Sequence, residues 1–206
     1  KEQSFNSPVS KRAAFAYGTS LNYLLSSDCN RIRIADTTIV FWAYRLGAKK
    51  EEQVFFWSLD PTEPTESDSS ERRLDPNTVA QIKSVLIKFK NGERPGNSEF
   101  DPDVRCFILG LAPNSARLSV RFWKVNSFGE LLENISQHYR DLDVVGMENI
   151  GSFVSPYRIL KAVAIQENSD NIPPLMGGML MKSILSGQLY PLTLYNAVLA
   201  RCRTGG

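Results

Sequence analysis

The sequence has few of the residues on which most metal and nucleophilic sites depend. Its 206 residues include three cysteines and one histidine. Cys29, Cys106 and Cys202 are odd in number and widely separated, whereas a zinc site or a disulfide framework requires paired, closer spacing. We therefore expect reduced thiols, no metal site and no cofactor.

Long apolar runs and nucleotide-binding motifs are also missing. No stretch approaches the roughly 20 apolar residues that span a bilayer. The sequence contains neither the glycine-rich phosphate loop that ends in Lys-Ser/Thr nor a Gly-x-Ser-x-Gly elbow. Gly177-Gly178 lies between two methionines in an apolar segment, so close helix packing explains this pair better than a nucleotide loop. We expect a cytoplasmic protein without catalytic residues.

Two titratable residues still require an explanation. His138 lies seven residues after Leu131, on the apolar face of a predicted helix, where a neighbour that satisfies the ring is a simpler explanation than catalysis. Asp36 lies inside a predicted strand, and hydrogen bonding to the backbone or pairing with an arginine explains it better than metal-assisted hydrolysis, which needs a second carboxylate. An RNA-processing nuclease is the least favoured alternative, because the histidine has no evident partner.

Acidic residues are concentrated in one segment. Six acids and two arginines lie between Asp60 and Asp75, and no acid follows Asn171. Without that segment the formal net charge rises from +2 to +6. Pro61–Arg73 has two prolines and no large apolar residue, which predicts a mobile loop. A basic body with an acidic loop is compatible with a nucleic-acid partner.

Hydrophobic periodicity predicts an α+β fold with a small, mainly antiparallel sheet flanked by helices. The first expected elements are a helix from Ser7-Pro8 with Ala14, Tyr17, Leu21, Leu24 and Leu25 facing a core, and a strand over 31–44 with a bulge near 36–38. The segment 48–59 fits a helix or a return strand through Val54-Phe-Phe-Trp57, and we favour the helix. Next we expect a helix over 75–92, a hairpin of a fully covered central strand, 104–111, with a second strand, 117–125, and a helix that begins at the capping box Ser127–Glu130. Three further helices are expected near 155–166, 173–187 and 190–203. This order is partly ferredoxin-like, but no fourth strand is recognised. We divide the chain into an α+β core over 1–150, with its loop at 61–73, and a helical segment over 151–206.

The strand over 117–125 carries the most informative pattern. Leu118, Val120 and Phe122 alternate with Arg117, Ser119, Arg121 and Trp123. The alternation predicts a core face and an opposite face with two guanidinium groups and an indole. Such a face suits a phosphate backbone with a base or ribose beside it.

Arg31 and Arg33 alternate with isoleucines in the same way. If both strands expose the same face of one sheet, four arginines form one basic surface, and Asn114 in the connecting loop offers a polar group beside it. The predicted nucleic-acid contacts are therefore Arg31, Arg33, Asn114, Arg117 and Arg121. The alternative is that the arginines are solvated surface residues or form salt bridges with Asp28, Asp36, Glu130 or Glu133.

Three sequence runs resemble a known family. They are Asn6-Ser-Pro-Val-Ser-Lys-Arg-Ala-Ala-Phe-Ala-Tyr17, Arg31-Ile-Arg-Ile-Ala-Asp-Thr-Thr-Ile-Val-Phe-Trp42 and the stretch from Gly110 to Leu142. In this order they resemble the large subunit of the type I-C (Dvulg subtype) CRISPR surveillance complex, Cascade. The likeness is nearly end to end, with an interruption at Pro61–Arg73. Since the chain starts at Lys1 without a methionine and ends on Arg203-Thr-Gly-Gly, we expect an internal, middle fragment of a larger polypeptide.

The resemblance implies a non-catalytic portion of an RNA-guided, DNA-targeting complex, in which guide pairing supplies sequence specificity. The implied partners are guide RNA and target DNA, the backbone and small subunits of Cascade, and a separately recruited helicase-nuclease that performs cleavage. No motif-reading residue of the family falls on this chain. The alternative is a purely structural protein–protein interaction module, whose arginines meet acidic faces of neighbouring subunits.

Overall fold

A four-stranded antiparallel sheet lies at the centre of the computed structural model, which describes residues 9–45, 47–59, 76–91, 93, 100–115, 117–143 and 153–204. Its strands lie side by side in sequence order: β1 (Arg31–Ile34), β2 (Thr37–Ala43), β3 (Arg105–Asn114) and β4 (Arg117–Ser127). All neighbouring pairs are antiparallel. The predicted α+β class with a small antiparallel sheet is confirmed.

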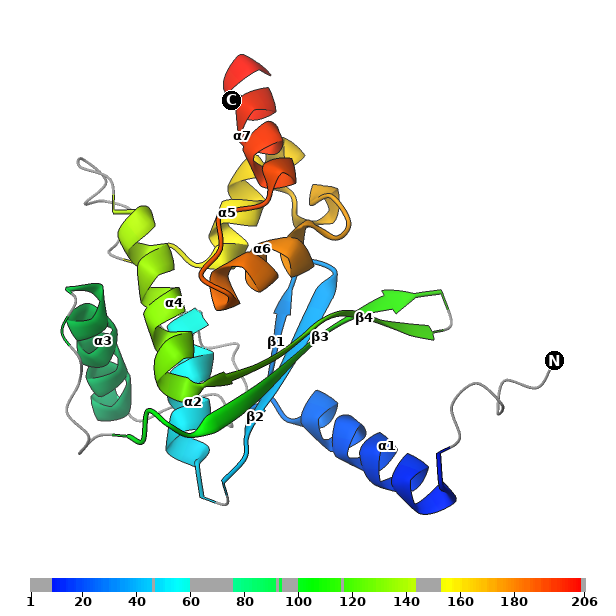
Figure 1. The fold of residues 1–206 in the computed structure, drawn as a ribbon. Coiled ribbons are helices and arrows are strands. Elements are labelled where there is room, and N and C mark those ends of the chain that lie inside the picture. The colour runs from blue at the N-terminus through cyan, green and yellow to red at the C-terminus, as the bar shows by residue number, and fades with distance from the viewer. Residues whose placement is uncertain are drawn as a thin grey trace.

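Helices flank this sheet (Figure 1). They are α1 (Lys11–Ser26), α2 (Lys49–Leu59), α3 (Pro76–Lys90), α4 (Phe128–Asp141), α5 (Pro156–Val163), α6 (Met176–Leu185) and α7 (Leu192–Thr204), with short 3-10 turns at Ile165–Glu167 and Ser169–Asn171. Helices α2, α4 and α6 cover one face of the sheet, α3 packs on α2 and α4, and α5 and α7 pack on α6. No helix within the described ranges is long and apolar enough to cross a membrane.

The predicted strand over 31–44 is two strands. β1 and β2 pair as a hairpin in which Ile34 lies opposite Thr37, so Ala35 and Asp36 form the turn. Ala35 has a φ of 53°, a left-handed conformation that reverses the chain. The alternation is therefore interrupted by a turn rather than by a bulge, and the strand that sequence reasoning did not recognise is the second half of this run.

A bulge in β4 overturns the predicted alternation in 117–125. Gly110 lies opposite Phe122 and Leu111 lies opposite Val120, which leaves Arg121 as the extra residue. Because an extra residue shifts the later side chains to the other face, Phe122 is buried in the core, whereas Leu118 and Val120 are exposed on the face that carries Trp123. A Cβ at Gly110 would overlap the Phe122 ring.

Helix α1 was predicted to pack into the core, but it does not. It begins at Lys11, after the N-cap Ser10, whose hydroxyl accepts a hydrogen bond of 3.1 Å from the Ala13 amide. None of its residues is buried, and Tyr17 is exposed. Figure 1 shows α1 on the side of the sheet away from α4 and α6.

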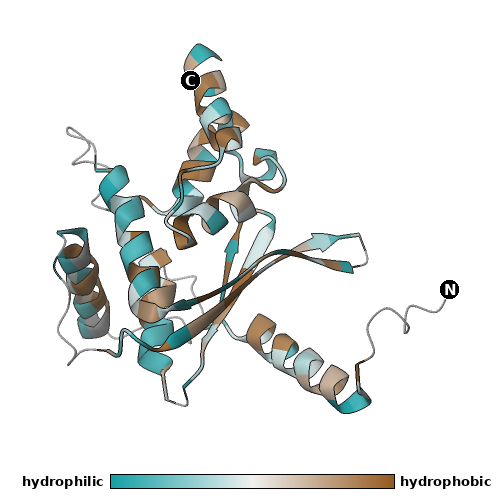
Figure 2. Cartoon of the chain, in the orientation of Figure 1, coloured by the Kyte–Doolittle hydropathy of each residue, from teal (hydrophilic) through white to brown (hydrophobic). Residues whose placement is uncertain are grey.

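The central strand β3 is covered fully on one face only. Ile108 is buried beneath the helices, whereas Phe107 and Leu109, which point to the other face, are half-buried. The prediction of a strand covered on both faces is therefore wrong. Figure 2 shows hydrophobic residues along much of β3 and hydrophobic residues interspersed with hydrophilic ones in α4.

The other predicted helices are confirmed with small shifts in their bounds. Helix α2 occupies 49–59, and the hydroxyl of Ser127 caps α4 by accepting a 3.3 Å bond from the Glu130 amide. Helices α5, α6 and α7 are the three predicted after residue 155. The loop at Pro61–Arg73 lies outside the described residues.

Close packing explains the Gly177-Gly178 pair of α6, as predicted. A Cβ at Gly177 would lie 2.6 Å from the Ile34 carbonyl oxygen, and one at Gly178 would lie 3.0 Å from Oγ1 of Thr37. The two glycines let α6 lie directly against the β1–β2 hairpin.

Candidate nucleic-acid interface

Arg31 and Arg33 project from the same face of β1. Ile32 and Ile34 between and beside them are buried in the core, while both arginines are exposed. The predicted alternation in this strand is confirmed. The guanidinium groups border a pocket of about 490 Å³ lined by Asp28, Arg31, Arg33, Asp36, Thr38 and Pro113.

Local hydrogen bonds orient the two guanidinium groups. Nη2 of Arg31 lies 2.9 Å from Oδ1 of Asp28, and its Nη1 donates to the Leu25 carbonyl at 2.6 Å. Nε of Arg33 donates to the carbonyl of Ala35 at 3.3 Å. A guanidinium group has five N–H donors, so a side chain that uses one or two of them for positioning keeps donors for a bound anion.

Asp36, which lines this pocket, contacts residues of β2, β4 and the start of α6. Its Oδ2 accepts a 3.2 Å bond from the Leu175 amide at the start of α6, and its Oδ1 accepts a 3.1 Å bond from the Thr37 hydroxyl. Nη2 of Arg121 in β4 lies 3.6 Å from Oδ2. Asp36 therefore bonds to backbone and pairs with an arginine, which is the structural role predicted for it.

The four arginines do not form one surface. Arg121, the bulge residue, lies on the helix-covered side, where its side chain approaches Gly178. Arg31 and Arg33 project from the opposite face, and β1 and β4 are the two edges of the sheet. Arg117 alternates with Leu118, which lies on the open face, so Arg117 also projects to the side of Arg121. The predicted common surface is therefore wrong for both Arg117 and Arg121.

Asn114 and Arg117 lie opposite each other at the exposed end of the β3–β4 hairpin. The preceding residue, Pro113, lines the same pocket as Arg31 and Arg33. Figure 1 shows this end of the β3–β4 hairpin extending beyond the rest of the sheet. We call the pocket beside Arg31 and Arg33 the arginine pocket, and we call the Asn114–Arg117 end of the hairpin the hairpin tip. Four of the five predicted contact residues lie in these two places.

An aromatic cluster on the open face of the sheet was missed by sequence reasoning. Ring centroids lie 5.5 Å apart for Trp42–Phe107, 5.5 Å for Trp42–Trp123 and 5.9 Å for Phe107–Trp123. Strand pairing produces the cluster, because Trp42 lies opposite Phe107 and Leu109 lies opposite Trp123. Each aromatic residue is visible in the sequence, but the pairing of β2 with β3 is not.

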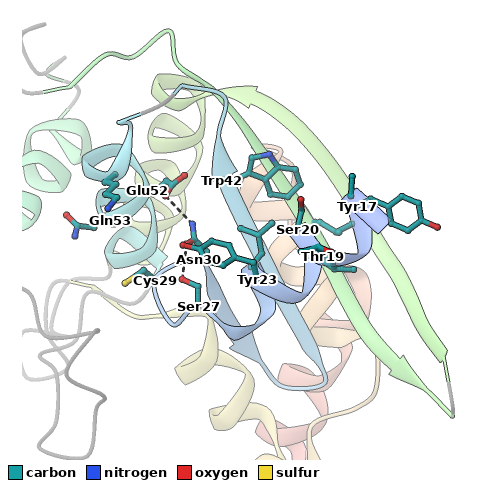
Figure 3. A pocket seen from close by; sticks show the side chains of 15 residues that line it. Tyr17, Thr19, Ser20, Tyr23, Ser27, Cys29, Asn30, Trp42, Glu52 and Gln53 are labelled. Atoms are coloured by element: carbon teal, nitrogen blue, oxygen red, sulfur yellow. Dashed lines mark hydrogen bonds between the residues drawn. The ribbon is translucent and has the colours of Figure 1, made fainter. Parts of the chain in front are cut away.

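A groove of about 1290 Å³ separates α1 from this open face. Its walls include Leu21 and Leu24 of α1 and Trp42 of β2, and Figure 3 shows the tyrosines of α1 along its length. At one end Nδ2 of Asn30 donates to Oε2 of Glu52 at 3.1 Å. Oε1 of Glu52 accepts a 2.9 Å bond from the amide of Ala43. The polar end of the groove is therefore internally bonded, and its walls offer apolar and aromatic contacts.

Comparison with known protein families adds the decisive observation about the kind of protein. The family model of the CRISPR-associated protein Cas_Csd1 matches residues 1–206, the whole chain. The chain belongs to the Cas_Csd1 family. A search of curated proteins finds no match.

The single histidine of this Cas_Csd1 chain is a core residue. His138 is 3% exposed, and its Nδ1 lies 2.7 Å from Oη of Tyr190. Burial lowers the pKa of His138 to about 4, although the Val154 backbone and Asp141 act in the opposite direction. The predicted neighbour that satisfies the ring is therefore Tyr190. Within the described ranges, no three His, Cys, Asp or Glu residues lie close enough together to hold a metal ion.

None of the three cysteines forms a disulfide, and they occupy different environments. Cys29 is half-buried, Cys106 is buried and Cys202 is exposed. Burial raises the pKa of the Cys106 thiol to about 12, with Glu52 and Glu51 adding to the effect. Since the thiolate is the reactive form of cysteine, Cys106 is an inert core residue at neutral pH.

Proposed function

We propose that this chain is a non-catalytic part of the large subunit of a type I-C CRISPR surveillance complex, and that it contacts nucleic acid through the arginine pocket and hairpin tip. The observation that carries the proposal is the pocket itself, where two oriented guanidinium groups face solvent in a CRISPR-associated chain. Guanidinium groups match phosphate oxygens in geometry and charge.

The proposed contacts are to backbone phosphates rather than to base edges. In RNA-guided complexes the guide reads the sequence by base pairing, and the protein holds the backbone. The proposed partners are guide RNA and target DNA, with the backbone and small subunits of the complex packing around this chain. Cleavage is assigned to a recruited helicase-nuclease, in keeping with the buried, Tyr190-bonded state of His138.

A salt titration tests the proposed nucleic-acid contact. Binding of the chain to short double-stranded DNA, single-stranded DNA and RNA is measured against salt concentration, for the wild type and for Arg31→Gln/Arg33→Gln. Each phosphate contact contributes about −0.9 to the slope of log K against log salt for duplex DNA. The double variant is expected to lower the magnitude of that slope by about 2.

The matched control is Lys161→Gln/Lys182→Gln, which removes the same charge from exposed positions on α5 and α6. This control is expected to keep the wild-type slope. Equal slopes for both double variants, or no binding to any of the three nucleic acids, would contradict the proposed contact.

A second candidate is a purely structural interaction module. The ion pairs Arg31–Asp28 and Arg121–Asp36 favour it, because they give two of the predicted contact residues partners within the chain. In that case Arg31→Gln/Arg33→Gln leaves nucleic-acid binding unchanged and instead weakens assembly with neighbouring subunits, which co-purification of the complex measures.

A further inference from the structure

Strand β4 forms a long, open edge of the sheet. It has 11 residues and pairs with β3 on one side. Within the described residues no strand pairs with its other side. An edge strand presents a row of backbone N–H and C=O groups that can pair with another chain.

One hydrogen bond at the end of β4 identifies which of its amides point outward. The Phe128 amide donates to the Val104 carbonyl at 2.8 Å, which directs the amide at position 128 toward β3. Because amides alternate in direction along an antiparallel strand, those of Lys124 and Asn126 also point toward β3. The amides of Trp123 and Val125 point away from the sheet.

The side chains on the open face of β4 are apolar. Leu118, Val120, Trp123 and Val125 are each at least 42% exposed. Natural proteins usually protect an edge of this length with charges, proline or a covering segment. Here the bulge at Arg121 twists the strand, but the apolar row continues on both sides of it.

The charge of β4 selects the kind of strand that can pair with it. Arg117, Arg121 and Lys124 are all basic, and the strand contains no acid. Two copies of β4 would place like charges side by side, which is unfavourable, whereas opposite charges on neighbouring strands are favourable.

We propose that β4 accepts an extended segment of a different polypeptide as a fifth strand, with apolar residues on the Trp123 face and acidic residues on the Lys124 face. Backbone bonds to the outward amides supply affinity, and the alternating side chains supply specificity. Arg31 and Arg33 lie on β1, the edge of the sheet opposite to Trp123 and Val125, so strand pairing at these two amides and the nucleic-acid contact at the two arginines can succeed or fail separately.

A short synthetic peptide that alternates valine and glutamate, with both ends capped, serves as the probe for the 206-residue chain. The matched peptide alternates valine and lysine. The acidic peptide is expected to bind saturably, to slow amide hydrogen exchange at Trp123 and Val125, and to bind at least about tenfold more tightly than the basic peptide.

Two substitutions separate backbone pairing from side-chain contact. Val125→Pro removes an outward donor and is expected to weaken binding at least about tenfold, whereas Val125→Thr keeps the amide and changes binding by less than about twofold. Lys124→Glu reverses the preference between the two peptides, and it provides an independent test if Val125→Pro disturbs the fold.

Three results would overturn the proposal. The first is binding of the acidic peptide without protection of the Trp123 and Val125 amides, or no binding at all. The second is equal affinity for both peptides in the wild type and in Lys124→Glu. The third is a dimer of the free chain, seen by light scattering, in which these amides are already protected.

Discussion

Helices α1 and α6 lie on opposite faces of the same sheet and differ in how many of their residues the rest of the chain buries. Helix α6 has 10 residues, of which Met176, Gly177, Gly178, Leu180, Met181, Ile184 and Leu185 are buried. Helix α1 has 16 residues and buries none of them. Its Phe15, Tyr17 and Tyr23 are exposed although they are aromatic.

The comparison shows that an apolar helix face in a sequence predicts that the face is covered. The pattern does not say whether this chain or another molecule covers it. Helix α6 buries its apolar face within this chain, so its residues serve stability. Helix α1 leaves aromatic side chains in solvent beside a groove and near the exposed arginines of β1. A helix of this length gains little stability alone. We infer that α1 and the open face of the sheet form the interacting side of the molecule.

The largest expected difference between the two helices comes from removing one leucine in each. Leu180 is fully buried in the core, and Leu180→Ala should lower the free energy of unfolding by about 3 kcal/mol. Leu21→Ala in α1 should cost less than about 1 kcal/mol, because Leu21 is half-buried at the groove. Urea unfolding measures both, and equal losses would remove the distinction between the helices.

A methyl group added to α6 should also be harmful. Because a Cβ at Gly177 would lie 2.6 Å from the Ile34 carbonyl oxygen, Gly177→Ala must separate α6 from the β1–β2 hairpin. The expected loss is about 2 kcal/mol, within the usual range for overpacking. Urea unfolding is again the measurement, and an unchanged midpoint would show that the contact is looser than described.

Acid should lower the stability of the folded chain through His138, the single histidine of the sequence. The pKa of His138 is lowered from 6.5 to about 4 in the folded chain. The unfolded chain therefore binds the proton first, and stability falls as pH decreases from 6.5 towards 4. The expected loss between pH 7.5 and pH 5 is about 2 kcal/mol. His138→Gln should remove this component, so an equal pH dependence in the variant would contradict the buried, neutral histidine.

The smallest expected effect is a gain in α1. A Cβ at Gly18 would meet no atom within 4 Å. Gly18→Ala should therefore stabilise the chain by about 0.5–1 kcal/mol through helix propensity alone. The melting temperature measures this gain. A lower melting temperature would show that Gly18 is packed against other atoms and does not face open space.

Local signals in the sequence predicted the local features of the fold. The capping box at Ser127, the helix favoured over 48–59 and the close packing of Gly177-Gly178 are all properties of short segments, and the structure confirms each of them. Asp36 and His138 were also assigned structural partners correctly in kind, although Tyr190 as the partner depended on the fold.

Features that depend on the pairing of distant strands were not predictable in the same way. The turn at Ala35 and Asp36 resembles an interruption within one strand, because both halves are apolar and β-branched. The bulge at Arg121 has no local signature, yet it decides which face Leu118 and Arg121 occupy. The Trp42–Phe107 stack joins residues that are far apart in the sequence.

Arginine footprinting tests most directly whether nucleic acid binds the open side of the sheet. A dicarbonyl reagent modifies exposed guanidinium groups, and mass spectrometry reads each position with and without bound DNA or RNA. We predict that Arg31 and Arg33 become protected, while Arg203 on α7, an exposed residue, stays reactive. Protection of Arg203 with unchanged modification of Arg31 and Arg33 would contradict this prediction.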